Sequence, residues 1–245
     1  MRVAFVGATR GMGRALSRLM AERGEALCLL GRDAAELAAS ARDLEARGAP
    51  GPVRTAPLDL ARPAGFEVAL AAAEEALGGF DTLVVTGGLL DPTEALQRDM
   101  PRLERMLHVN FTGTVLLCQL AAERLAARGG GRLCVFSSVA GDRPRRSNYL
   151  YGASKAGLSA FLEGLGHAYA ERGVSVLCVK PGFVKTGLTD GLPVPPLAGE
   201  PAPVARTVLR ALDAGRRVVY APPVWRWIML VVRSLPHAAM RRIRF

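Results

Sequence analysis

The pair Tyr151 and Lys155 is the feature of this sequence best suited to chemistry. Residues four apart on a helix share one face, so the phenol and the ammonium group should lie together. A nearby positive charge favours phenolate and lowers the phenol pKa from its usual value of about 10. A phenol tuned in this way can give a proton to a carbonyl oxygen, or take one from an alcohol, near neutral pH. Tyr149 is the rival tyrosine, but the residue four positions after it is Ala153.

A glycine-rich loop follows the first apolar run and precedes a helical pattern. Its spacing, G-x-x-x-G-x-G, permits a tight turn and lets the backbone approach a pyrophosphate closely. The N-terminus of the following helix would offer free N–H groups and the positive end of its dipole. The alternative is a glycine turn with a structural role only. The loop predicts dinucleotide contacts from Gly7, Thr9, Arg10, Gly11, Met12 and Gly13.

The end of the second apolar run indicates which nicotinamide cofactor is preferred. Enzymes that use NAD usually place a carboxylate here for the ribose hydroxyls. We expect Arg32 at this position, with Asp33 as the N-cap of the next helix. Arg32 and Arg10 together would suit the 2′-phosphate of NADP(H), which we expect to be preferred, with NAD(H) as the alternative. In that alternative Arg32 is a solvated surface residue and Asp33 binds the ribose. Asp59, at the end of the third run, would read the adenine amino group.

Apolar runs and helical patterns alternate along the whole chain. Most runs lack polar–apolar alternation, as expected of strands that are buried on both faces of a parallel sheet. The predicted strands are residues 2–6, 26–30, 53–57, 82–86, 132–136, 174–180 and 217–221. The predicted helices are residues 13–23, 34–47, 65–77, 102–127, 151–172 and 202–214, with a loop or lid at 192–203. This order implies right-handed crossovers. We therefore predict an α/β single-domain Rossmann fold over residues 1–245, with a doubly wound, seven-stranded parallel sheet and helices on both faces.

The composition excludes several classes of protein. Half of the 245 residues are apolar, which excludes a disordered or fibrous chain. The N-terminal apolar run is too short to be a secretory signal. The four cysteines, Cys28, Cys118, Cys134 and Cys178, lack the spacing of metal or redox motifs, so we expect buried thiols and no metal site. These observations predict a cytoplasmic protein. The net charge of +10 suits nucleic acid, but the C-terminal arginines flank a contiguous apolar run at 228–232, which disfavours that partner.

With these motifs in order, residues 1 to about 190 resemble the short-chain dehydrogenase/reductase family. The family pattern places its serine thirteen residues before the tyrosine, which selects Ser138 over Ser137. The resemblance implies that Ser138 holds the substrate carbonyl, while Lys155 binds the nicotinamide ribose and tunes Tyr151. Asn110 would order a water behind Lys155. The implied catalytic set is Asn110, Ser138, Tyr151 and Lys155.

The same resemblance identifies the segment 181–186 as the loop beside the nicotinamide. The implied cofactor contacts there are Pro181, Gly182, Val184 and Thr186, in addition to Tyr151 and Lys155. The sequence departs from the family pattern at Val6, where a threonine is usual, and at residues 85–88 after the fourth strand. Gly87 in that segment is still an expected cofactor contact.

A narrower resemblance concerns residues 141–150 and 218–229, the second of which enters the basic, aromatic tail at 222–245. Both are similar to a bacterial branch that includes decaprenylphosphoryl 2-keto-pentose reductases, which act on a polyprenyl-linked sugar at the membrane. Arginines and tryptophans in the tail suit an anionic lipid surface, so peripheral contact with the inner membrane face is one hypothesis. The alternative is a helix at 224–235 that packs on the core or on a partner subunit.

These patterns lead to one main functional hypothesis and two rivals. The main hypothesis is an NAD(P)H-dependent oxidoreductase that interconverts a ketone and a secondary alcohol, with Tyr151 as general acid/base. Its substrate would be bulky, such as a lipid-linked keto-sugar. The first rival is a reductase of 3-oxoacyl groups on a carrier protein or coenzyme A. The second is a non-catalytic dinucleotide sensor or membrane-associated binding protein, which would have no need for a tuned phenol. The family resemblance also implies a homodimer or homotetramer.

Overall fold

Seven parallel strands form one sheet in the computed structural model, which describes residues 1–242. Their order across the sheet is β3-β2-β1-β4-β5-β6-β7. The strands are β1 (Arg2–Val6), β2 (Ala26–Gly31), β3 (Arg54–Pro57), β4 (Thr82–Val85), β5 (Gly131–Phe136), β6 (Val174–Pro181) and β7 (Val218–Ala221). The predicted α/β fold with a seven-stranded parallel sheet is therefore confirmed.

The strand order reverses between β1 and β4, which lie next to each other in the sheet. The chain after β1 crosses over to β2, and the chain after β4 crosses to β5 on the opposite side. Loops that leave the two strands therefore diverge, and a crevice opens at their carboxyl ends. Ligands of doubly wound sheets bind at such a switch point.

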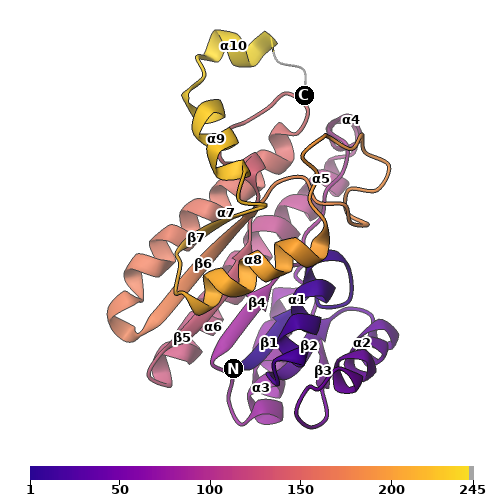
Figure 1. Ribbon diagram of the computed structural model, residues 1–245, viewed down its shortest axis with the longest axis vertical. Helices are drawn as coiled ribbons and strands as arrows, with labels where there is room; N and C mark the ends of the chain where they lie inside the picture. The colour runs from indigo at the N-terminus through magenta and orange to yellow at the C-terminus, as the bar shows by residue number, and fades with distance from the viewer. Residues whose placement is uncertain (243–245) are drawn as a thin grey trace.

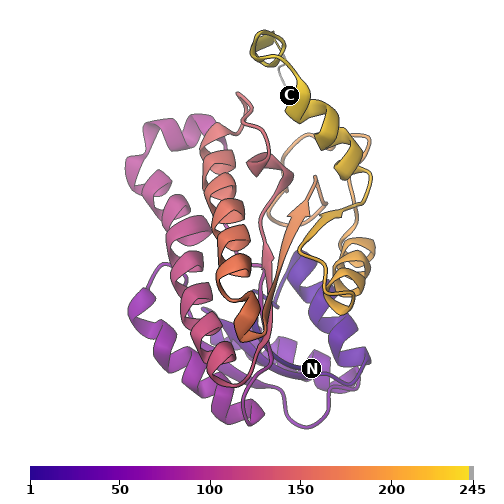
Figure 2. The ribbon, with the colours of Figure 1, turned by 90° about the vertical axis from the view of Figure 1, so that its left-hand side faces the viewer.

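Helices cover both faces of the sheet, as Figures 1 and 2 show. One face carries α1 (Gly11–Glu22), α2 (Ala34–Ala46) and α8 (Pro201–Asp213), and the other carries α3 (Phe66–Leu77), α6 (Gly113–Ala127) and α7 (Tyr149–Ala168). Each layer of helices packs on one face of the sheet and covers a separate apolar core. Val3 and Phe5 of β1 point into the core beneath α1 and α8, whereas Ala4 and Val6 point into the other one. This alternation along one strand explains why β1 is apolar at nearly every position.

The prediction of one continuous helix over residues 102–127 is wrong. The structure instead has α5 (Met100–Leu107), a π-helical turn (His108–Thr112) and then α6, and it adds the unpredicted short helix α4 (Thr93–Arg98). In the π-turn the Thr114 hydroxyl donates to the carbonyl of Val109, at 2.9 Å. A Cβ on Gly113 would overlap the carbonyl oxygen of Leu60, so a glycine is needed for this close approach. The wider turn sits where Asn110 enters the core, as π-turns often do at functional sites.

Other helix boundaries differ by a few residues from the prediction. Helix α7 begins at Tyr149 and ends at Ala168, and a separate 3₁₀ turn (Ala170–Arg172) follows it. Further 3₁₀ turns lie at Pro63–Gly65 and Val139–Gly141. The predicted loop at 192–203 is irregular up to α8, which begins at Pro201. The four cysteines are buried free thiols, as predicted.

The C-terminal segment forms two helices, α9 (Trp225–Ser234) and α10 (His237–Arg242), which project from one end of the molecule (Figures 1 and 2). Met229 on one side of α9 is buried against the body, whereas Trp227, Leu230 and Val231 are more than 60% exposed. Residues 243–245 of the predicted tail lie outside the described residues. Within residues 1–242 no helix has the length and hydropathy needed to cross a membrane.

Candidate active site

The glycine loop forms one wall of a cavity of 960 Å³ at the switch point. Gly7 has a φ of +87°, a conformation that side chains rarely adopt. A Cβ on Gly13 would overlap the carbonyl oxygen of Gly7 and lie 2.5 Å from the hydroxyl of Thr86, so the two glycines set the tightness of the turn. No side chain of the described residues caps the N-terminus of α1, which leaves its backbone N–H groups available to an anion. The predicted residues that line the cavity are Gly7, Thr9, Arg10, Gly11, Met12, Gly13, Arg32, Asp59, Gly87 and Thr186.

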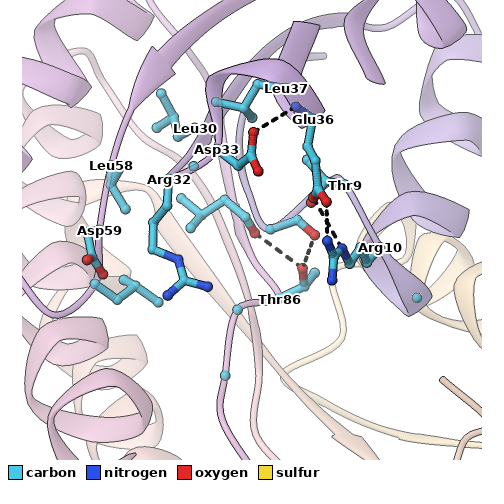
Figure 3. A pocket seen from close by; sticks show the side chains of 18 of the residues that line it. Thr9, Arg10, Leu30, Arg32, Asp33, Glu36, Leu37, Leu58, Asp59 and Thr86 are labelled. Carbon is cyan, nitrogen blue, oxygen red and sulfur yellow. Dashed lines mark hydrogen bonds and ion pairs between the residues drawn. The ribbon is translucent and has the colours of Figure 1, made fainter. Parts of the chain in front are cut away.

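Thr86 braces the glycine loop from the neighbouring strand. Its hydroxyl donates to the carbonyl oxygens of Val6 at 3.2 Å and Gly7 at 2.9 Å (Figure 3). Sequence reasoning expected a cofactor contact from Gly87 in the segment 85–88 but gave Thr86 no role. The structure shows that a threonine hydroxyl after β4 holds the end of β1 and the first glycine together.

Five charged side chains surround the far end of the cavity, at the carboxyl ends of β2 and β3. Asp33 caps α2 as predicted, accepting from the backbone N–H of Glu36 at 3.0 Å. Arg10 does not stand free beside Arg32, because its Nε donates to Glu36 at 3.2 Å and its Nη2 forms an ion pair with the same carboxylate. The Glu36 carboxylate raises the pKa of Arg10, and Arg10 lowers the pKa of Glu36. Figure 3 shows the pair on one side of the pocket and Arg32 on the side of Asp59.

The two serines that follow β5 have different surroundings. The hydroxyl of Ser137 donates to the carbonyl of Lys155 at 3.0 Å and lies 2.7 Å from the hydroxyl of Ser159, so it is engaged by α7. Ser138 is also buried, and its hydroxyl accepts from the N–H of Ala140 at 3.1 Å. A hydrogen bond with Ser138 lowers the pKa of Tyr151, which brings the predicted serine and tyrosine together.

Tyr151 and Lys155 lie on the first turns of α7 and face the same region. The ammonium nitrogen of Lys155 is 5.9 Å from the centroid of the Tyr151 ring and donates to the carbonyl of Phe136 at 3.0 Å. Burial lowers the pKa of Lys155 to about 8. Burial also raises the pKa of Tyr151 to about 12, although Ser138 and the charge of Arg145 act in the opposite direction. The expectation of a lowered phenol pKa is therefore wrong for this structure, because desolvation outweighs the favourable neighbours.

Tyr149 occupies a different environment. It is 41% exposed, and its hydroxyl accepts from the amide of Gln97 at 3.2 Å. Of the two tyrosines, Tyr151 is the one that is half-buried and lies beside both a serine and a lysine.

Asn110 is fully buried at the π-helical turn. Its Oδ1 accepts from the N–H of Leu89 at 2.7 Å, and its Nδ2 donates to the carbonyl of the same residue at 2.8 Å. A second, longer bond joins Nδ2 to the hydroxyl of Ser154 at 3.4 Å. A Cβ on Gly88 would lie 3.3 Å from Asn110 Oδ1 and 3.5 Å from Lys155 Nζ, so both side chains approach the loop after β4.

The loop after β6 is only partly in the cavity wall. Thr186 lines the cavity, whereas Pro181, Gly182 and Val184 do not. Val184 is buried and bridges to Gly199. A Cβ on Gly182 would overlap the indole of Trp225 from α9, so the C-terminal segment packs directly on this loop. Sequence reasoning missed the contact, because nothing in the spacing of the two residues indicates it.

Asp142, Lys180 and Tyr220 form a partly buried polar cluster behind the segment that follows Ser138. The Asp142 carboxylate accepts from Lys180 Nζ at 2.5 Å and from the Tyr220 hydroxyl at 2.7 Å. The cluster joins the segment after Ser138, the end of β6 and the edge strand β7. Burial and the Asp142 carboxylate raise the pKa of Tyr220 to about 12. The sequence offered no signal for this cluster beyond three polar residues in otherwise apolar surroundings.

Comparison with known proteins agrees with this geometry. The family model for short chain dehydrogenases matches residues 2–193. An uncharacterized oxidoreductase of Mycobacterium tuberculosis is 35% identical over 241 residues, which cover 98% of this chain and 96% of the relative. Carbonyl reductase family member 4 of Xenopus tropicalis is 29% identical, over 86% of this chain and 90% of the relative.

A solved structure supports the fold. The short-chain type dehydrogenase/reductase from Mycobacterium ulcerans superposes with a TM-score of 0.81 at 22% identity, over 89% of this chain and 86% of that chain. The order of the strands and the glycine loop of this chain therefore agree with the match to the family model over residues 2–193. The chain belongs to the short-chain dehydrogenase/reductase family of oxidoreductases.

Proposed function

We propose that this oxidoreductase converts a ketone into a secondary alcohol, with Tyr151 as the proton donor. The observation that carries the proposal is the grouping of Asn110, Ser138, Tyr151 and Lys155 at the carboxyl edge of the sheet, beside a cradle for a dinucleotide. The cradle suits such a group, because Gly7 and Gly13 keep the turn tight and the start of α1 has no side-chain cap among the described residues. A nicotinamide cofactor bound there would supply the hydride.

The pKa values favour the reductive direction at neutral pH. A phenol with a pKa of about 12 is protonated at pH 7, which is the form that donates to a carbonyl oxygen. Lys155, with a pKa of about 8, remains mainly an ammonium ion at pH 7. Its charge, 5.9 Å from the ring, stabilises the phenolate that remains after proton donation. Ser138 supports the same phenolate and can hold the substrate oxygen.

The proposal is tested by comparing Tyr151→Phe with Tyr149→Phe. The first substitution should lower kcat by about 10²- to 10⁴-fold, the usual contribution of general acid–base catalysis, without weakening the binding of NADPH. The second removes a hydroxyl of an exposed tyrosine and should leave kcat unchanged. Normal turnover by Tyr151→Phe would contradict the proposed role.

For the cofactor we propose a preference for NADP(H) over NAD(H). Arg32 lines the cavity at the end of β2, where no hydrogen bond or ion pair engages its side chain among the described residues. Arg10 stands at the same end of the cavity. Substitution of Arg32 by aspartate should weaken NADPH binding relative to NADH, because a repulsive charge then faces the 2′-phosphate. An unchanged ratio of the two dissociation constants would refute the preference.

The substrate that we propose is an amphipathic ketone, such as a lipid-linked keto-sugar, taken from the cytoplasmic face of a membrane. The exposed side of α9 carries Trp227, Leu230 and Val231, and Arg226 stacks over Trp227 with 5.7 Å between guanidinium and ring. Residues 224–242 contain four arginines and no acidic residue, which suits an anionic surface. Packing of Trp225 on the loop after β6 brings this helix next to the catalytic edge.

The membrane proposal is tested by co-sedimentation with vesicles of phosphatidylglycerol and phosphatidylcholine. A Trp227→Ser, Leu230→Ser variant should lose binding while its melting temperature stays constant, because both side chains are exposed. A parallel screen of NADPH oxidation with keto-sugar and 3-oxoacyl substrates distinguishes the lipid-linked ketone from the carrier-bound alternative. Equal sedimentation of variant and parent would contradict the membrane contact.

We also propose that the protein is a homodimer or homotetramer that associates through α6 and α7. Phe111 in the π-helical turn and Leu116 in α6 are each more than a third exposed. Light scattering after size-exclusion chromatography tests this, and replacing Leu116 by arginine should shift the assembly towards the monomer. A monomeric parent protein would contradict the proposal.

A further inference from the structure

The adenosine end of the cavity carries more negative than positive charge. Arg10 and Arg32 face the carboxylates of Asp33, Glu36 and Asp59 there. Asp33 is engaged by the N-terminus of α2, and Asp59 accepts from the N–H of Ala61 at 3.0 Å. Glu36 differs from them, because its carboxylate neutralises one of the two cations that could bind a 2′-phosphate.

A phosphate group can replace the Glu36 carboxylate as the partner of Arg10. Glu36 engages the Nε and Nη2 edge of the guanidinium, which is the edge that binds carboxylates and phosphates in the same forked geometry. The side chain of Arg10 is 76% exposed and that of Glu36 is 32% exposed. Exposed ion pairs contribute little stability, so a phosphate can displace the carboxylate at small cost. Once displaced, Glu36 would still place a negative charge beside the phosphate dianion.

We propose that Glu36 is a specificity-determining residue that limits the preference for NADP(H), by competing with the 2′-phosphate for Arg10. This inference rests on the proposed function, since it assumes that a nicotinamide dinucleotide binds in the cradle. NADPH and NADH differ only by the 2′-phosphate, so Glu36 should affect the first and not the second. The family pattern used to predict the site contains no role for this position.

Direct binding, measured by nicotinamide fluorescence, tests the proposal without depending on turnover. Glu36→Gln removes the charge but keeps an acceptor for Arg10, whereas Glu36→Ala removes both. Each variant should tighten NADPH binding about two- to tenfold and change NADH binding less than twofold, with a larger effect at low salt. Glu22→Gln is the matched control, because it breaks a similar exposed pair with Arg47 away from the cavity and should change neither constant.

Measurements in an Arg10→Gln background show whether Glu36 competes with the 2′-phosphate for Arg10 or only repels the phosphate by its charge. If Glu36 acts through Arg10, then most of the gain from Glu36→Gln should disappear in that background. Weaker NADPH binding by both Glu36 variants would overturn the proposal, because it would show that Glu36 positions Arg10 for the phosphate. Equal changes for NADPH and NADH would also overturn it. A parent protein that binds neither dinucleotide would instead contradict the proposed function itself.

Discussion

Replacement of Lys155 by methionine should stabilise the protein at neutral pH while abolishing turnover. Burial lowers the pKa of Lys155 from 10.5 to about 8, so the folded state holds the ammonium ion at a cost. A difference of about 2.5 between the two pKa values corresponds to about 3 kcal/mol at any pH below 8. Methionine fills nearly the same volume without a charge. The carbonyl of Phe136 loses its bond to Nζ, which offsets about 1 kcal/mol. The expected net gain at pH 7 is about 2 kcal/mol in the free energy of unfolding.

The dependence on pH makes this prediction specific. Above pH 8 the folded lysine loses its proton before the unfolded one, so the unfolded state binds more protons and the parent protein gains stability as pH rises. The advantage of Lys155→Met should therefore shrink by about 2 kcal/mol between pH 7 and pH 9.5. Urea unfolding at the two pH values measures it. Lys185→Met is the control, because that side chain is about half exposed and pairs with Glu200 at 2.7 Å. A Lys155→Met protein less stable than the parent at pH 7, with no change at pH 9.5, would refute the reasoning.

Three further substitutions test the residues that support the candidate site, namely Gly13, Asn110 and Tyr220. Gly13→Ala should abolish dinucleotide binding and lower the melting temperature, since its Cβ overlaps backbone, whereas Gly65→Ala meets open space away from the cavity and should do neither in the same fluorescence and melting assays. Asn110→Ala removes two bonds to a backbone segment and should cost about 2–3 kcal/mol in urea unfolding; a cost below 1 kcal/mol would contradict this. Tyr220→Phe leaves the buried Asp142 carboxylate with one partner fewer and should cost about 1–2 kcal/mol at pH 7, which the same titration would detect.

The fold was largely predictable because its strands are buried on both faces. In β1 every residue after Arg2 is covered by one helical layer or the other, so the apolar run coincides with the strand. The break between α5 and α6 was not predictable in this way. A π-turn continues the helical pattern of side chains, and the close approach of Gly113 to Leu60 beside it joins residues far apart in the chain.

In the candidate site, too, the features that depend on neighbouring residues were predictable and those that depend on the folded environment were not. The step from Tyr151 to Lys155 is local, so the spacing of four residues indicated that the two side chains are neighbours. The pKa of the phenol depends instead on how deeply the site is buried, which no spacing reports. The Arg10–Glu36 pair was missed for a related reason, since two exposed charges 26 positions apart meet only after β2 and α2 are in place.

The contact between Gly182 and Trp225 has a consequence for how this protein can diverge. Any side chain at position 182 must occupy space that the indole of Trp225 already fills. A larger residue there becomes acceptable only after the tryptophan is exchanged for something small. Position 182 can therefore change only after position 225 or together with it, so descendants of this sequence that remodel the loop after β6 must alter the C-terminal helix first or at the same time.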